Sequence, residues 1–149
     1  MTHKRVLFLC TGNSARSQMA EGLVNALLSD TWRAYSAGTK PSGYVHPLAI
    51  LAMAELDIDL SEQWSKSTDT FREQPFDLVI TVCDNAASNC PTWLGAGTTV
   101  HLGFPDPAAS TGDERAQLQV FRDIRDALQD EVVDFVARWD GDTPPEFRL

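Results

Sequence analysis

The sequence predicts an α/β fold in one domain, with a four-stranded parallel sheet flanked by helices on both faces. Short apolar runs typical of buried strands alternate with amphipathic segments typical of helices along the whole chain. Connections through helices favour parallel neighbouring strands. The 149 residues suffice for one hydrophobic core but not for two comfortable ones. We therefore expect residues 1–149 to form a single domain, with about 140–149 as a loose C-terminal tail.

The first half of the chain contains two predicted strands and two predicted helices. Val6 to Leu9 is an apolar run that indicates a buried strand, and Trp32 to Ser36 indicates a second one. Pro47 suits the first turn of a helix that runs to about Leu56, because its missing N–H costs little there. A helix from Ser17 to about Leu28 lies between the strands, and its predicted apolar face consists of Met19, Leu23, Val24, Leu27 and Leu28.

The second half contains two further strands and a long helix. Asp77 to Val82 is apolar nearly throughout, as strands covered on both faces tend to be, and Thr98 to Leu102 is the fourth strand. Thr111 and Glu114 form a capping-box pattern that predicts the start of the last helix. Its apolar residues then recur at steps of three and four: Leu118, Phe121, Ile124, Leu128, Val132, Phe135 and Trp139.

Composition excludes several classes of protein. The net charge is −9 and the sequence pI is near 4.6, so nucleic acid and anionic membrane are poor partners. No apolar run approaches the ~20 residues that span a bilayer, and Val6–Leu9 is too short for the apolar part of a signal peptide. We expect a cytoplasmic protein. Its three cysteines are then structural, metal-binding or redox-active thiols rather than a disulfide scaffold.

The segment after the first predicted strand has the features of an anion site. Cys10 and Arg16 are separated by five residues between a strand and a helix. Backbone N–H groups of such a loop, together with the helix N-terminus, attract an anion, and Arg16 can hold two of its oxygens. The same field favours a Cys10 thiolate, to which the Ser17 hydroxyl can donate. The predicted binding loop consists of Thr11, Gly12, Asn13, Ser14, Ala15, Arg16 and Ser17.

Two other interpretations apply to this loop. Cys10 can be a small core residue at the end of a strand. A nucleotide-binding loop is excluded, because the Gly-Lys-Ser/Thr ending is absent. The predicted topology favours a site, since ligands bind at the carboxyl ends of parallel strands. Cys10, Cys83 and the loop after Leu102 each follow a strand, so we expect all three at one edge of the sheet.

The segment Cys-Thr-Gly-Asn-Ser-Ala-Arg-Ser-Gln-Met-Ala-Glu-Gly (10–22) resembles the active-site loop of the thioredoxin-coupled arsenate reductases, which share the low-molecular-weight tyrosine phosphatase fold. The resemblance covers nearly the whole chain. It continues through Tyr35-Ser36-Ala37-Gly38, Asp57-Ile58-Asp59-Leu60-Ser61, Val82-Cys83-Asp84 and Gly103-Phe104-Pro105-Asp106-Pro107. The Cys10 loop by itself does not separate reductases from phosphatases.

Cys83 and Cys90 distinguish the two activities. They lie in the small, polar segment Cys-Asp-Asn-Ala-Ala-Ser-Asn-Cys-Pro, and the resemblance implies that both are redox cysteines. Two inert surface thiols are one alternative. Zinc is another, although the spacing is not Cys-x-x-Cys and only His101 is nearby as a further ligand. We expect no metal and no cofactor.

Asp106 has a local and a functional interpretation. Pro-Asp-Pro favours a turn, and local sequence alone supports a turn residue. The predicted position at the active edge and the resemblance favour a general acid. Phosphatases of this fold usually carry Tyr immediately after the Asp-Pro pair, whereas this chain has Ala108, which argues against a tyrosine phosphatase.

The resemblance implies a reaction in which Cys10 attacks arsenate, Asp106 protonates the leaving oxygen, and a Cys10/Cys83/Cys90 disulfide relay releases arsenite. Thioredoxin would then reduce the protein. A phosphatase that hydrolyses phosphoesters through a phosphocysteine is the first alternative. A thiol-based redox sensor without turnover is the second.

A last expectation concerns a cation beside the loop. Some of these reductases bind potassium through side chains that correspond to Asn13, Glu21 and Ser36 and through an aspartate, at whose position this chain has Lys66. The resemblance therefore predicts that the Lys66 ammonium replaces the metal and neutralises Glu21. The alternative is a solvated surface lysine.

Overall fold

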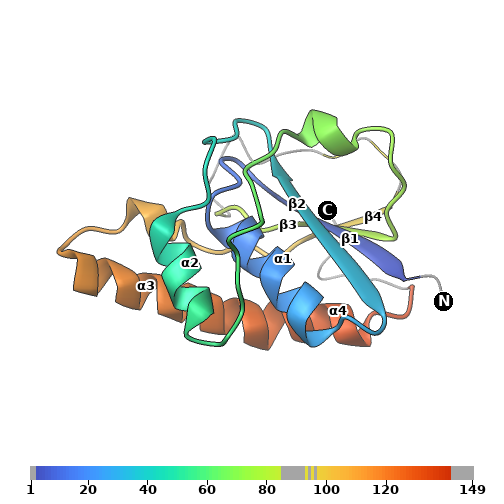
Figure 1. Cartoon of the computed structure of the whole chain (residues 1–149). Helices are drawn as coiled ribbons and strands as arrows, with labels where there is room; N and C mark the ends of the chain where they lie inside the picture. The colour runs from blue at the N-terminus through green and yellow to red at the C-terminus, as the bar shows by residue number, and fades with distance from the viewer. Residues whose placement is uncertain (1–2, 85–92, 94, 96, 142–149) are drawn as a thin grey trace.

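A four-stranded, fully parallel sheet forms the centre of the computed structural model, which describes residues 3–84, 93, 95 and 97–141. The strands are β1 (Lys4–Cys10), β2 (Trp32–Gly38), β3 (Leu78–Thr81) and β4 (Thr98–His101), in the order β2-β1-β3-β4 (Figure 1). The predicted fold class is confirmed. Because all strands run the same way, their carboxyl ends lie at one edge of the sheet.

Four α-helices and a π-helix cover one face of the sheet in the described part of the chain (Figure 1). They are α1 (Arg16–Leu27), α2 (Pro47–Ala54), α3 (Glu114–Ala127), the π-helix η3 (Leu128–Val133) and α4 (Asp134–Arg138). Val6 and Phe8 point into this layer and are fully buried with Met19, Leu23 and Phe121. Burial of each such side chain contributes about 1.5–3 kcal/mol, so this layer supplies most of the core.

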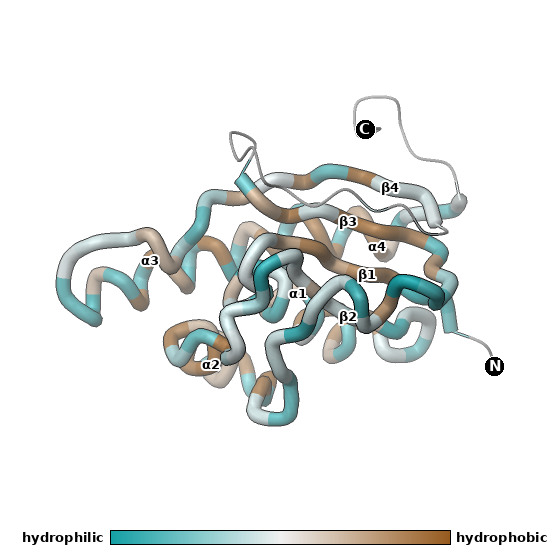
Figure 2. The backbone as a smooth tube through the Cα atoms, turned by 90° about the horizontal axis from the view of Figure 1, so that it is seen from above, coloured by the Kyte–Doolittle hydropathy of each residue, from teal (hydrophilic) through white to brown (hydrophobic). Residues whose placement is uncertain are grey.

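The opposite face of the sheet has a thinner cover. Leu7, Leu9 and Val79 point toward it and pack with Phe71 and Phe76. Phe71 belongs to the 3-10 helix η1 (Thr68–Phe71), which lies across the sheet from the α-helices (Figure 1). The helices expected on both faces are thus α-helices on one face and a 3-10 helix on the other. Figure 2 shows that hydrophobic residues are concentrated along β1 and β3, the two central strands.

The predicted start of the last helix is wrong in detail. Asp113, and not Thr111, is the N-cap of α3, and its side chain accepts a hydrogen bond from Ala116 N at 2.9 Å. Gly112 has a φ of +100° and turns the chain immediately before the cap. Asp113 is therefore the last residue with an extended backbone, and its carboxylate satisfies a free N–H of the first turn.

The apolar pattern of the last helix also changes along its length. Ile124, Leu128, Val132 and Val136 are buried at successive steps of four. Four residues overrun an α-helical turn of 3.6 residues, and the wider turns of η3 absorb the excess. Phe135, which was expected on the buried face, is only partly buried because the π-helix rotates Val136 into that position.

Two smaller expectations concern Leu27 and the C-terminal tail. Leu27 is 48% exposed rather than part of the apolar face, because α1 ends at this residue and the chain turns away from the core. Residues 142–149, most of the expected loose tail, lie outside the described residues. Within the described ranges, every helix is too short or too polar to span a bilayer.

Candidate active site

Cys10 is the last residue of β1, and Arg16 is the first residue of α1, so the predicted loop joins the sheet edge to a helix N-terminus. The free Cys10 thiol is 2% exposed. Its Sγ accepts a hydrogen bond from Asn13 N at 3.2 Å and lies 2.9 Å from Ser17 Oγ. Ser17 Oγ in turn accepts from Asn13 Nδ2 at 2.8 Å, so the hydroxyl proton of Ser17 is directed at the sulfur. Both contacts hold the Cys10 sulfur at the base of the loop.

The carbonyl groups of the loop point away from its centre. They accept backbone hydrogen bonds from the segment 40–46: Thr11 O from Lys40 at 2.9 Å, Gly12 O from Ser42 at 2.9 Å, and Ser14 O from His46 at 2.8 Å. In a trans peptide the N–H points opposite to the C=O. The amides that follow these carbonyls are therefore directed into the loop, as the Asn13 N–H to Cys10 Sγ contact illustrates. The predicted amide-lined cradle is present.

The helix N-terminus adds to the positive potential of the loop. Ala15 is the N-cap of α1 and provides no side-chain acceptor, and the first turn contains no acidic residue. The free N–H groups of a helix start carry a partial positive charge. Because no carboxylate of the first turn neutralises this charge, an anion is the complementary ligand.

Asn13 holds the shape of the loop from within. Its φ is +48°, a conformation that Asn tolerates better than most residues, and its side chain is fully buried. The amide oxygen accepts from Lys66 N at 2.8 Å and from Gln18 Nε2 at 2.9 Å. Asn13 therefore connects the thiol, α1 and the segment before η1 in one hydrogen-bond network.

Gly38 leaves room for the loop. A Cβ atom at this position would lie 2.4 Å from Thr11 O, 2.9 Å from Cys10 O and 3.0 Å from Asn13 N. All three atoms belong to loop backbone and cannot rotate away. Any larger residue at the end of β2 would therefore displace the loop. Sequence reasoning did not assign Gly38 this role, although a glycine at the end of a strand is a signal of close backbone approach.

Arg16 meets the loop that follows β4. Its side chain is 8% exposed. Nη1 donates to Phe104 O at 3.0 Å, and Nη2 lies 3.9 Å from Asp106 Oδ2. Asp106 is 45% exposed and also accepts from Ala108 N at 3.0 Å as the cap of η2 (Pro107–Ala109). The turn interpretation of Asp106 is therefore confirmed, and its role as a general acid stays a prediction. The expected meeting of the Cys10 loop and the loop after Leu102 is confirmed.

Cys83 lies at the same edge of the sheet. Leu9 pairs with Thr81, and Val82 N donates to Leu9 O at 2.9 Å. The register therefore places Cys83 just beyond the end of the strand that neighbours Cys10. Cys83 is 1% exposed and is disulfide-bonded in this structure, whereas Cys10 is a free thiol. Cys90 lies outside the described residues.

His46 is a neighbour of the loop that sequence reasoning missed. Its N–H donates to Ser14 O, its Nδ1 accepts from Leu48 N at 3.1 Å as the cap of α2, and its ring lies 4.6 Å from that of Phe121. Burial lowers the pKa of His46, and the nearby Asp106 carboxylate partly opposes this shift. The His-Pro pair at a helix start was the available signal, but histidine is not among the usual capping residues.

Lys66 is buried, so the expectation of a solvated surface lysine is wrong. It is 5% exposed, and its Nζ lies 3.7 Å from Glu21 Oε1, which also accepts from Ser36 Oγ at 2.6 Å. Burial raises the pKa of Glu21, and Lys66 opposes this; burial lowers the pKa of Lys66, and Glu21 opposes that. An ammonium beside Glu21 does not fit a set of potassium ligands, because potassium requires oxygen donors. The described residues also contain no cluster of His, Cys, Asp and Glu suited to a metal.

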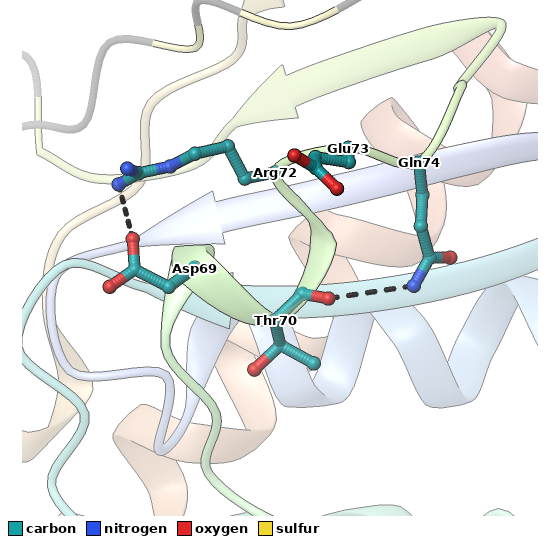
Figure 3. Close-up of a pocket in the computed structure, with 5 residues that line it drawn as sticks. All are labelled: Asp69, Thr70, Arg72, Glu73 and Gln74. Carbon is teal, nitrogen blue, oxygen red and sulfur yellow. Dashed lines mark hydrogen bonds and ion pairs between the residues drawn. The ribbon is translucent and has the colours of Figure 1, made fainter.

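A separate surface depression lies at η1 (Figure 3). It is lined by one short segment that contains none of the predicted site residues: Asp69, Thr70, Arg72, Glu73 and Gln74. The Arg72 guanidinium is paired with Asp69, and Gln74 Nε2 donates to Thr70 O.

Residues 5–143 match the model of the low molecular weight phosphotyrosine protein phosphatase family, and the chain belongs to that family. Similar relatives within the family include arsenate reductases. The arsenate reductase of Halalkalibacterium halodurans is 47% identical over 86% of this chain and 91% of that protein. The arsenate reductase of Bacillus subtilis is 42% identical over 91% of this chain and 96% of that protein.

Solved structures of arsenate reductases and low molecular weight phosphatases have the same fold as this chain. A structure described as an arsenate reductase in the phosphate binding state has a TM-score of 0.72 and 33% identity, and covers 92% of this chain and 99% of its own. A low molecular weight protein tyrosine phosphatase from T. tengcongensis has a TM-score of 0.68 and 27% identity, and covers 90% of this chain and 97% of its own. The fold is therefore common to reductases and phosphatases.

Proposed function

We propose that this protein reduces arsenate to arsenite, with Cys10 as the nucleophile and thioredoxin as the reductant. The observation that carries the proposal is the environment of Cys10. Its sulfur lies in an amide-lined loop at a helix N-terminus, with hydrogen bonds from Asn13 N and Ser17, and Arg16 paired with Asp106 beside it. The relatives that are 41–47% identical and are named arsenate reductase support arsenate as the oxyanion.

Arsenate binding is the first task of the loop. The amides that point into the loop, such as those of Gly12, Asn13 and Ala15, donate to the arsenate oxygens, and the guanidinium of Arg16 holds two of these oxygens. Arg16 is fixed by its bond to Phe104 O, so little side-chain entropy is lost when the anion arrives. These interactions offset the overall net charge of −9, which repels anions at long range.

In the first chemical step the Cys10 thiolate attacks arsenic. A sulfur–arsenic bond forms, an arsenic–oxygen bond breaks, and Asp106 transfers a proton to the departing oxygen, which leaves as water. Asp106 is partly exposed and lies within 3.9 Å of Arg16, a position from which a proton can reach the bound oxyanion.

The second step requires the reduced protein, because Cys83 is disulfide-bonded in this structure. Once reduced, the Cys83 thiolate attacks Cys10 Sγ. The sulfur–arsenic bond breaks, its electron pair reduces arsenic to the trivalent state, and arsenite leaves behind a Cys10–Cys83 disulfide. Cys90 then attacks Cys83, which frees Cys10 and leaves a Cys83–Cys90 disulfide. Thioredoxin supplies two electrons to that bond, and we infer that the cycle runs in the reducing cytosol.

A phosphatase is the second candidate, since it would use Cys10, Arg16 and Asp106 and hydrolyse a phosphocysteine with water. Two features favour the reductase. Ala108 stands where tyrosine phosphatases of this fold usually carry an aromatic residue, and Cys83 lies beside the strand end of Cys10. A redox sensor without turnover would leave the pair of Arg16 and Asp106 without a role.

The deciding experiment measures arsenate-dependent NADPH oxidation by the purified protein with thioredoxin and thioredoxin reductase. Hydrolysis of para-nitrophenyl phosphate is measured beside it. Sustained NADPH oxidation that needs both arsenate and thioredoxin supports the reductase. Efficient phosphoester hydrolysis without arsenate reduction would establish the phosphatase instead.

A further inference from the structure

The backbone of Lys66 is bonded to the two residues that shape the Cys10 loop. Its N–H donates to Asn13 Oδ1 at 2.8 Å, and its C=O accepts from Gly38 N at 2.9 Å. Gly38 also forms an isolated parallel bridge with Ser67. The segment around Lys66 thus lies against the outer side of the loop, and any movement of this segment is transmitted to Asn13.

A backbone carbonyl, a carboxylate and an aromatic ring surround the Lys66 ammonium. Nζ donates to Trp64 O at 2.8 Å, lies 3.7 Å from Glu21 Oε1, and lies 4.5 Å from the centre of the Trp64 ring. The lysine side chain is 4% exposed, whereas Trp64 is 63% exposed. The indole therefore forms the outer cover of a buried cation and stabilises it through its π face.

Glu21 supplies the matching negative charge. It lies on α1, is 12% exposed, and accepts from Ser36 Oγ on β2. A buried carboxylate needs a countercharge, because its removal from water is costly. Lys66 is the cation within 4 Å of Glu21 among the described residues. The pair joins three elements that surround the loop: α1, β2 and the segment before η1.

The network reaches the thiol through Asn13 and Gln18. Gln18 Nε2 donates to Asn13 Oδ1 at 2.9 Å and to Trp64 O at 2.9 Å, the same carbonyl that accepts from Lys66 Nζ. Asn13 then contacts Ser17 and Cys10. The backbone N–H of Lys66 is therefore connected to Cys10 through Asn13, and its ammonium is connected through the Trp64 carbonyl, Gln18 and Asn13.

We propose that Lys66 is a positioning residue: its ammonium is a built-in cation that holds the Cys10 loop in its anion-binding conformation, where some related reductases use potassium. The inference deepens the proposed function, because the loop that Lys66 positions is the proposed arsenate site. An ammonium on a covalent tether needs no binding from solution, so the loop is preorganised at any potassium concentration.

Three variants test this role. Lys66→Met keeps the length of the side chain and removes the charge, and Lys66→Asp restores a carboxylate beside Glu21. Lys4→Met is the matched control, since Lys4 is an exposed lysine that lies 5.7 Å from the ring of Trp32 at the opposite end of β1. Affinity for inorganic phosphate and the rate of Cys10 alkylation, located by peptide mapping, are measured in potassium and in sodium chloride at equal ionic strength.

The unmodified protein and Lys4→Met should behave alike in both salts. Lys66→Met should bind phosphate about 10- to 100-fold more weakly, the range typical of residues that support an ion site, and phosphate should protect Cys10 less. Lys66→Asp should regain affinity in potassium but not in sodium.

Two results would overturn the proposal: a potassium-specific gain in phosphate affinity by the unmodified protein, or unchanged affinity and alkylation in Lys66→Met. The first can be measured even if Lys66→Met does not fold. Neither readout needs arsenate reduction, so a failure of the proposed function would be seen separately, as absence of turnover in the unmodified protein.

Discussion

Gly38→Ala should damage the active site without unfolding the protein. The added methyl would lie 2.4 Å from Thr11 O, 2.9 Å from Cys10 O and 3.0 Å from Asn13 N. Carbon atoms do not approach backbone atoms so closely. The end of β2 cannot shift alone, because Gly38 is in register with Cys10 on one side and bridges Ser67 on the other. The loop must therefore move away from β2.

The expected losses of stability and activity follow from the steric overlap of the added methyl group with the loop. Inserting one methyl group into a packed site costs about 1–3 kcal/mol. For a protein of 149 residues, each kcal/mol lowers Tm by about 2–4 °C, so we expect a loss of about 2–12 °C. Because the displaced atoms carry Cys10 and the amides of the cradle, a shift of about 1 Å should lower kcat/KM about 100-fold.

Differential scanning calorimetry and thioredoxin-coupled arsenate turnover give the two measurements. Gly141→Ala is the control, since a Cβ there meets no atom within 4 Å although its φ of +106° is also left-handed. This control should lose a small amount of stability and no activity. Wild-type Tm and turnover in Gly38→Ala would show that the loop does not depend on the space that glycine provides.

Three further perturbations probe other parts of the account. Arg16→Lys should lower kcat/KM at least about 100-fold, because a lysine ammonium cannot replace the bidentate hydrogen bonds of a guanidinium. Near-normal arsenate turnover in the thioredoxin-coupled assay would exclude the proposed anion site. Cys10→Ser should abolish turnover while the Tm stays close to that of the parent, since the hydroxyl can accept the same hydrogen bonds; residual cycling would identify another nucleophile. Glu55 has its pKa lowered from 4.5 to about 2, chiefly by hydrogen bonds from Arg122 and Arg125. Ionised Glu55 therefore stabilises the folded state above pH 4.5, and this stabilisation is lost as the pH falls toward 2. Urea titrations should show a higher free energy of unfolding for the parent protein than for Glu55→Gln near neutral pH, and no difference near pH 2. A difference that does not change with pH would contradict the lowered pKa.

The parts of the fold that were predictable are those set by local pattern. The apolar run at Val6–Leu9 and the nearly continuous one at Asp77–Val82 gave the central strands, because parallel strands are buried on both faces. The meeting of Arg16 with the loop of Asp106 was also predictable. Parallel strands place all their carboxyl ends at one edge, so residues 90 positions apart converge without any knowledge of their contacts.

Other features depend on contacts that sequence spacing does not show. The capping box at Thr111 had the right residue types, but Gly112 turns the chain so that Asp113 becomes the cap. Steps of four in the last helix were visible, yet only packing against the sheet decides whether a π-helix absorbs them. The role of Gly38 required the distance to a loop that is 25 or more positions away.

The burial of Lys66 was the feature that its local sequence indicated least. A lysine in a polar segment is usually solvated, and its local sequence gave no sign of burial. Glu21 and Ser36, its partners, lie 45 and 30 positions earlier, and Trp64 covers it from two positions away. Resemblance to potassium-binding relatives pointed to the position, and only the arrangement of α1 and β2 accounts for a buried ammonium there.

The disulfide relay is tested most directly by a single turnover of Cys90→Ser with arsenate, followed by peptide mass mapping under non-reducing conditions. The account predicts about one arsenite released per protein molecule and a trapped Cys10–Cys83 disulfide, whereas Cys83→Ser should release none by the intramolecular route. Sustained thioredoxin-driven cycling by Cys90→Ser, or arsenite release without a bond between Cys10 and Cys83, would contradict the three-thiol relay.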